Sequence, residues 1–148
     1  MRVDGASVRG DGLEFLPHPV SKVWRALTTP ALLAQSLMEN DFEPVVGHRF
    51  GMQGIPVPAV GFSGQVVSGV LEVVPESRLA ISWADALGGN ALASVVTFTL
   101  VPEGSGTRLL LRHSGFNASD PSQVAAHRVM SGGWRSQVLP RLVGVLEA

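Results

Sequence analysis

The spacing of hydrophobic residues first changes near Pro19. Leu13 to Leu16 reads as the end of a strand that we expect to begin near Val8. Beyond Pro19, apolar side chains recur at helical spacing, and they do so again after Thr29. Proline suits the first turn of a helix and threonine suits an N-cap, so this part of the chain predicts two short helices in succession.

Alternating hydrophobic and polar residues dominate the middle of the chain. This is the spacing of a strand with one buried face. It occurs in His48–Met52, Gly64–Val74, Leu79–Trp83, Val96–Leu100 and Thr107–His113. Glycine and proline separate these segments, as in hairpins, so the pattern predicts an antiparallel meander of about six strands.

A long helix is predicted for the last part of the chain. Asp120 has the residue type of an N-cap, and Pro121 that of a first helical position. Pro140 removes one backbone hydrogen bond, so we expect a kink between Ser136 and Pro140. The apolar stripe of this helix comprises Trp134, Val138, Leu142 and Val145.

Gly132 and Gly133 interrupt the helical sequence just before Trp134. Each glycine disfavours a helix by about 1 kcal/mol relative to alanine. Two explanations stay open. The glycines either allow close packing of the helix against the sheet or, together with Pro140, form a hinge that lets Trp134–Leu139 move to admit a ligand.

Composition narrows the possible functions. The 148 residues fit a single domain (1–148) with a net charge of -1. There is no basic stripe for nucleic acid and no apolar run of the roughly 18–20 residues that insert across a membrane. The first twelve residues lack the apolar core of a signal peptide, so we expect a cytoplasmic protein. Cysteine is absent, which excludes disulfides and thiol nucleophiles, and tyrosine is absent as well.

The histidines and serines form no recognisable catalytic or metal-binding motif. His18, His48 and His127 do not pair with another histidine or a carboxylate at metal-ligand spacing, so we expect no metal and no other cofactor. The sequence Gly61-Phe62-Ser63-Gly64 breaks the spacing of a hydrolase nucleophile elbow. We therefore assign no catalytic residue from motifs alone.

A series of short segments follows a characteristic order along nearly the whole chain, roughly from Leu13 to Leu146. It begins with Leu16–Thr28. It continues with Asn40–Phe42, Val46–Phe50, Val70–Pro75, Arg78-Leu79, Ile81–Trp83, Gly106–Leu109, His113–Phe116 and Gly133-Trp134. The series resembles the SRPBCC superfamily and, within it, the group named after the activator of the heat-shock-protein ATPase.

The resemblance implies an α+β helix-grip fold. In that fold a curved antiparallel sheet carries two short helices after strand 1, and a long C-terminal helix packs across the sheet. The resemblance also implies a cavity between sheet and helix, as in steroid-transfer and birch-pollen-allergen-like domains. The loop Asp85–Ser94 is either a flap at its mouth or a plain surface loop. The residues expected to line the cavity are Leu37, Phe50, Met52, Ile81, Trp83, Phe98, Leu111, His113, Met130 and Trp134.

Three functions stay open, because the fold does not fix an activity. We favour binding or carriage of an apolar or aromatic, lipid- or polyketide-like small molecule, without covalent chemistry, since polar cavity residues are few. The second is a cyclase or aromatase that uses His113 with Gln137 or Arg141, although a structural role for His113 is the favoured alternative. The third is a protein-interaction module of the co-chaperone kind, although the chain lacks the second domain of such activators. A protein partner or a homodimer is also compatible with the sequence.

Overall fold

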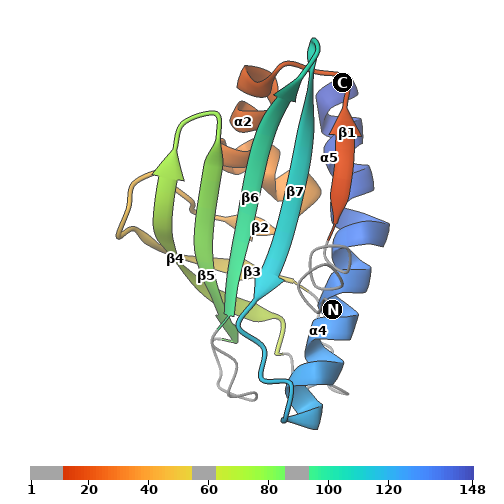
Figure 1. Ribbon diagram of the computed structural model, residues 1–148. Coiled ribbons are helices and arrows are strands. Elements are labelled where there is room, and N and C mark those ends of the chain that lie inside the picture. Colours follow the sequence, from red (N-terminus) through yellow and green to blue (C-terminus); the bar gives the residue numbers. More distant parts are fainter. Residues whose placement is uncertain (1–11, 55–62, 86–93) are drawn as a thin grey trace.

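The computed structural model of the protein describes residues 12–54, 63–85 and 94–148 (Figure 1). The expected strand start near Val8 and nearly all of the loop Asp85–Ser94 lie outside this part of the chain. The described residues form an α+β helix-grip fold, which confirms the predicted fold class.

The described strands form one antiparallel sheet of seven strands in the order β1-β7-β6-β5-β4-β3-β2. Each strand from β2 onward pairs with its successor in the chain, and β1 pairs with β7. The strand that the sequence did not reveal is β2, whose two residues are too few to show alternation. The bounds are β1 Leu13–Leu16, β2 Glu39–Asn40, β3 Arg49–Gln53, β4 Gln65–Val74, β5 Arg78–Asp85, β6 Ser94–Glu103 and β7 Gly106–Ser114.

The alternation of residue types decides which face of the sheet is buried. In β6 and β7, Val96 pairs with His113 and Phe98 pairs with Leu111, and all four side chains are buried. The residues between them point to the other face and are half-buried or exposed. Because β6 and β7 keep this period of two, one face of this part of the sheet faces the core.

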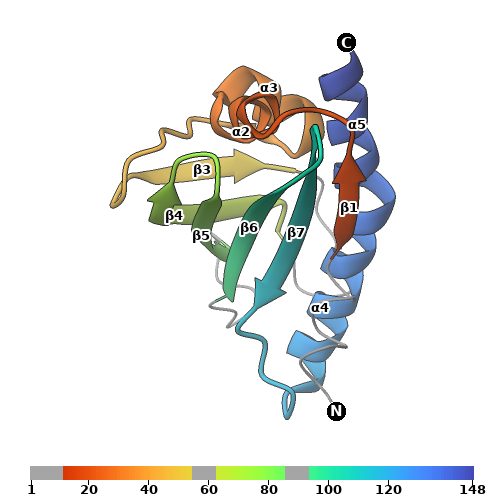
Figure 2. The same ribbon diagram turned by 45° about the horizontal axis from the view of Figure 1, so that its top comes forward.

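Two short helices and one long C-terminal helical segment pack against the sheet. The long segment runs along the sheet, and α2 and α3 lie near one end of it (Figures 1 and 2). Thr29 occupies the N-cap of α3, as predicted, but its side chain makes no capping hydrogen bond. The bounds are α2 Val20–Thr28, α3 Pro30–Ser36, α4 Pro121–Gly133, the π-helical turn η2 Trp134–Val138 and α5 Leu139–Glu147.

The irregularity expected near Pro140 is this π-helical turn. The N–H of Leu139 donates to the carbonyl of Trp134, five residues earlier, instead of four. A π turn of this kind adds one residue to the helix. The prediction for the apolar stripe was therefore wrong at two positions. The residues buried beside Trp134 and Leu142 are Leu139 and Leu146, and not the predicted Val138 and Val145. Val138 and Val145 are only partly buried at its side.

Candidate ligand-binding site

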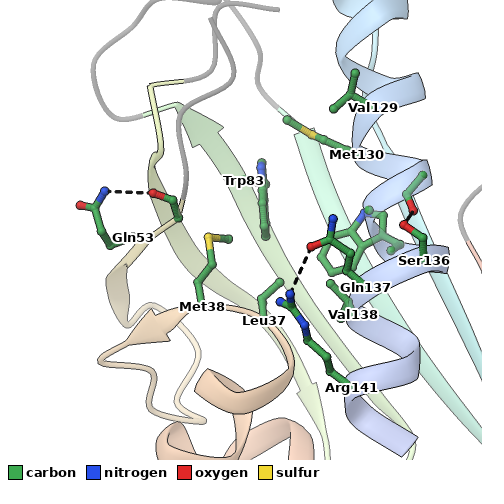
Figure 3. A pocket seen from close by; sticks show the side chains of 14 residues that line it. Leu37, Met38, Gln53, Trp83, Val129, Met130, Ser136, Gln137, Val138 and Arg141 are labelled. Atoms are coloured by element: carbon green, nitrogen blue, oxygen red, sulfur yellow. Dashed lines mark hydrogen bonds between the residues drawn. The ribbon is translucent and has the colours of Figure 1, made fainter.

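A pocket of about 680 Å³ lies between the C-terminal helical segment and the sheet (Figure 3). One wall comes from α4, η2 and the start of α5, and the other from the end of α3, the end of β3 and β5. The described residues that line it are Leu37, Met38, Gln53, Gly54, Trp83, Val129, Met130, Gly132, Gly133, Trp134, Ser136, Gln137, Val138 and Arg141.

The pocket has an apolar floor and a polar mouth. Leu37, Trp83 and Trp134 are buried, and the two indole rings meet edge to face with their centroids 5.4 Å apart. Gln137 and Arg141 are exposed, so the pocket opens to solvent on that side of the helix. An apolar interior with a few polar groups at one end is the usual build of a small-molecule site.

Four of the ten residues expected to line a cavity do line this pocket. They are Leu37, Trp83, Met130 and Trp134. The other six belong to the packed core outside it and are Phe50, Met52, Ile81, Phe98, Leu111 and His113.

Trp134 explains why some of the expected residues lie in the packed core instead of lining the pocket. Its ring contacts Phe98 with a centroid distance of 6.3 Å and His113 with one of 5.9 Å, in both cases edge to face. The indole therefore fills the space over β6 and β7 that the sequence assigned to a ligand. The open volume lies to the side of Trp134, toward Gln53 and Gly54 at the end of β3.

The predicted cavity lining did not include one side of the pocket wall, although the sequence analysis named Gln137 and Arg141 as possible cyclase residues and Gly133 as part of a possible hinge. Val129, Gly133, Gln137 and Arg141 follow one another at intervals of four residues, and all four line the pocket. This spacing places them along one side of a helix. The spacing is present in the sequence, but a search for apolar stripes does not join a valine, a glycine and two polar residues into one side of a helix.

Gly132 and Gly133 are not needed for close packing. A Cβ atom built on either glycine would meet no atom within 4 Å among the described residues beyond its own stretch of helix. The close-packing explanation is therefore wrong. Both glycines line the pocket, where the missing side chains leave open space in its wall.

A chain of hydrogen bonds joins the helix to three strands behind the pocket. The Nε1–H of Trp134 donates to Nδ1 of His113 at 3.2 Å, and Nε2 of His113 lies 2.9 Å from Oγ of Ser94. The hydroxyl of Ser94 donates to the carbonyl of Trp83 at 2.8 Å. An indole nitrogen can only donate, so Nδ1 carries no proton and Nε2–H is the donor to Ser94.

His113 is held in its neutral form at physiological pH. Burial lowers its pKa from 6.5 to about 3, and an electrostatic interaction with His127 adds to the effect. Both ring nitrogens have partners within the protein, and His113 does not line the pocket. This arrangement favours the structural reading of His113 over that of a general acid or base.

Other kinds of site have little support in the described residues. Within 12–54, 63–85 and 94–148, no group of three or more histidine, aspartate or glutamate side chains could hold a metal ion. None of the helices in the same ranges is both long and apolar enough to cross a membrane.

A comparison with models of protein families identifies the family of the chain. The model of the family described as Activator of Hsp90 ATPase homolog 1-like protein matches residues 17–147. The chain belongs to this family. A search of curated proteins gave no match.

Solved structures similar to this member of the Hsp90 ATPase activator homolog family share the fold along most of the chain. Protein MLL2253 from Mesorhizobium loti is 37% identical with a TM-score of 0.75, and the match covers 92% of this chain and 94% of that one. DynU16, a putative protein in the dynemicin biosynthetic locus, is 26% identical with a TM-score of 0.72. That match covers 93% of this chain but 46% of DynU16.

A third structure is similar in fold alone. PFC0360w, an HSP90 activator from Plasmodium falciparum, is 18% identical with a TM-score of 0.70, and the match covers 92% of this chain and 94% of that one. An HSP90 activator and a putative protein from a biosynthetic locus thus both share the fold with this member of the Hsp90 ATPase activator homolog family. The fold therefore does not distinguish a small-molecule role from a protein-partner role.

Proposed function

We propose that the protein binds an apolar or aromatic, lipid- or polyketide-like small molecule in the pocket beside Trp134. The observation on which this rests is the form of the pocket, in which buried Leu37, Trp83 and Trp134 make the floor and exposed polar residues make the mouth. A ligand would place its apolar body against the two indoles. Burial of that body would supply most of the binding free energy.

The size and the lining of the pocket support this function. A volume of about 680 Å³ lies within the range of about 300–1,000 Å³ that is usual for ligand pockets. Met38 and Met130 line it from opposite walls. Methionine side chains are flexible and polarizable, so they adapt to ligands of different shape. The resemblance to DynU16, from a biosynthetic locus, agrees with a small molecule as the ligand.

The two rival functions have weaker support. A cyclase that uses His113 would need this imidazole to reach the ligand, but both of its nitrogens are engaged and it lies outside the pocket lining. The co-chaperone function rests on the family name and on a structure that is 18% identical. No feature of the described surface selects a protein partner over a small molecule.

The proposal is tested by measuring dye binding to a variant in which a larger side chain in the pocket wall occupies part of the pocket. The probe is N-phenyl-1-naphthylamine, an uncharged dye whose fluorescence rises in apolar surroundings. We expect wild-type protein to bind it at one site. Gly133→Leu should weaken binding by about tenfold, or about 1.4 kcal/mol, because the new side chain enters the open space in the wall.

Gly144→Leu is the matched control for this experiment. Gly144 is an exposed helical glycine with no atom within 4 Å of its Cβ position, and it does not line the pocket. The same change there alters helix propensity without touching the pocket, so dye affinity should stay within twofold, or about 0.4 kcal/mol. Equal dye binding by the Gly133 and Gly144 variants would show that the dye binds elsewhere.

A further inference from the structure

Arg141 is the charged side chain of the pocket. Among the fourteen described residues of the lining, the others are all uncharged. Arg141 is exposed on α5, and its guanidinium reaches toward Gln137 on the side of the pocket that faces Leu37 (Figure 3). Any molecule that enters with its apolar part against the indoles would leave its other end near this cation.

Most of the hydrogen-bonding capacity of Arg141 is unused. A guanidinium has five N–H donors. The hydrogen bond that Arg141 makes runs from Nη2 to Oε1 of Gln137, at 3.3 Å. The ion pairs within the described part of the chain are Arg78–Glu72 and Arg108–Glu103, and neither includes Arg141. Its positive charge therefore has no carboxylate beside it there.

Gln137 adds further donors at the same place. Its carbonyl oxygen accepts from Arg141, so the orientation of the amide is fixed by chemistry: only the oxygen can accept. The amide nitrogen, with two N–H groups, is left over. The two side chains are four residues apart and lie on one side of the helix. Together they present several donors and one positive charge.

The opposite rim does not repeat this pattern. Nε2 of Gln53 donates to the carbonyl of Gly64 at 3.3 Å, so its donors are partly occupied by the backbone. Figure 3 shows this side chain directed away from the helix. The donors and the charge are thus concentrated at one end of the pocket.

Resting on the proposed function, we propose that the ligand carries a carboxylate, which Arg141 and Gln137 bind at the mouth while the apolar body lies against Trp83 and Trp134. The planar fork of a guanidinium matches the two oxygens of a carboxylate, and such charge-assisted bonds are stronger than neutral ones. The ligand class is therefore an apolar or aromatic carboxylic acid rather than a neutral lipid. Arg141 acts as a specificity-determining residue for that class.

A pair of ligands with the same tail tests the inference. Dodecanoate below its critical micelle concentration and dodecanol below its solubility limit are used to displace N-phenyl-1-naphthylamine from the protein near neutral pH. We expect wild type to bind dodecanoate about tenfold more tightly than dodecanol. Arg141→Gln should remove this preference, so that the two ligands bind with affinities within about twofold of each other. In wild type the preference should shrink with added sodium chloride, because the site is open to solvent.

Two further variants separate a specific contact from general charge. Arg135→Gln removes the same charge from an exposed position of the same helical segment that does not line the pocket, so the preference should persist. Gln137→Glu keeps the shape of the side chain but gives Arg141 a carboxylate partner within the protein. That variant should lose the preference as well.

The outcomes distinguish this inference from the proposed function. If the dye does not bind wild type, both are wrong. A different outcome is that the dye binds wild type and Gly133→Leu weakens its binding, but dodecanoate and dodecanol bind equally. In that case the proposed ligand pocket is supported, and the inference that the ligand carries a carboxylate is wrong. An equal loss of preference in Arg135→Gln and Arg141→Gln would also overturn the assignment to Arg141.

Discussion

Acid is expected to destabilise the fold through His113. In the folded protein its pKa falls from 6.5 to about 3, because burial removes water from the charged form and an electrostatic interaction with His127 adds to the effect. In the unfolded chain the imidazole is in water and takes up a proton near pH 6.5. Between these two pKa values the unfolded state binds more protons. The free energy of unfolding therefore falls as the pH falls through this window, and the contribution is complete only above it.

The magnitude follows from the two pKa values of His113. Linkage gives a loss of about 2 kcal/mol near pH 5 and about 4 kcal/mol near pH 3, relative to neutral pH. A domain of this size has a total stability of about 5–15 kcal/mol, so the loss is a large share of it. The protonated ring would also turn an N–H toward the N–H of Trp134, which removes that hydrogen bond.

Urea unfolding at a series of pH values, followed by tryptophan fluorescence, measures this effect. His113→Gln lacks the titrating group, so between neutral pH and pH 5 its stability should fall by about 2 kcal/mol less than that of wild type. It should also be less stable at neutral pH, because the hydrogen bonds to Trp134 and Ser94 are disturbed. Parallel curves for wild type and His113→Gln would refute the reasoning.

Three other substitutions have expected effects on the free energy of unfolding, measured in urea at neutral pH. Trp134→Phe should lower the free energy of unfolding by about 1–3 kcal/mol, because it leaves Nδ1 of His113 buried without its donor. An unchanged free energy of unfolding would show that this hydrogen bond does not stabilise the fold. Ser68→Ala should be neutral or stabilise the protein by about 1 kcal/mol, because the buried Oγ of Ser68 has no hydrogen-bond partner among the described residues. Ser94→Ala should destabilise the protein, because Ser94 bonds to His113 and Trp83; a larger loss of stability in Ser68→Ala than in Ser94→Ala would contradict both expectations. Gly133→Ala should stabilise by up to about 1 kcal/mol, and a loss of stability would mean that the new methyl group clashes after all.

The amino-acid sequence by itself determined the elements and their buried faces. In Val96–Leu100 and Thr107–His113, side chains alternate between the two faces of any extended chain, so the hydrophobic half identifies the core side before any pairing is known. Pro19, Thr29 and Pro121 restrict the backbone locally, and helices begin at or beside each of them. The two-residue strand β2 shows the limit of this information, because only its pairing with β3 makes it a strand.

Only the tertiary structure decided where the core leaves open space. The π turn before Pro140 advances the helix by one residue, which rotates the following side chains by about 100° and buries Leu139 instead of Val138. The spacing of residues along the chain does not contain that rotation. It is also the placement of the helix that sets Trp134 over Phe98 and His113 and leaves the pocket beside Gly133. A sequence tells which side chains avoid water, but which of them fill the same volume depends on contacts between distant segments.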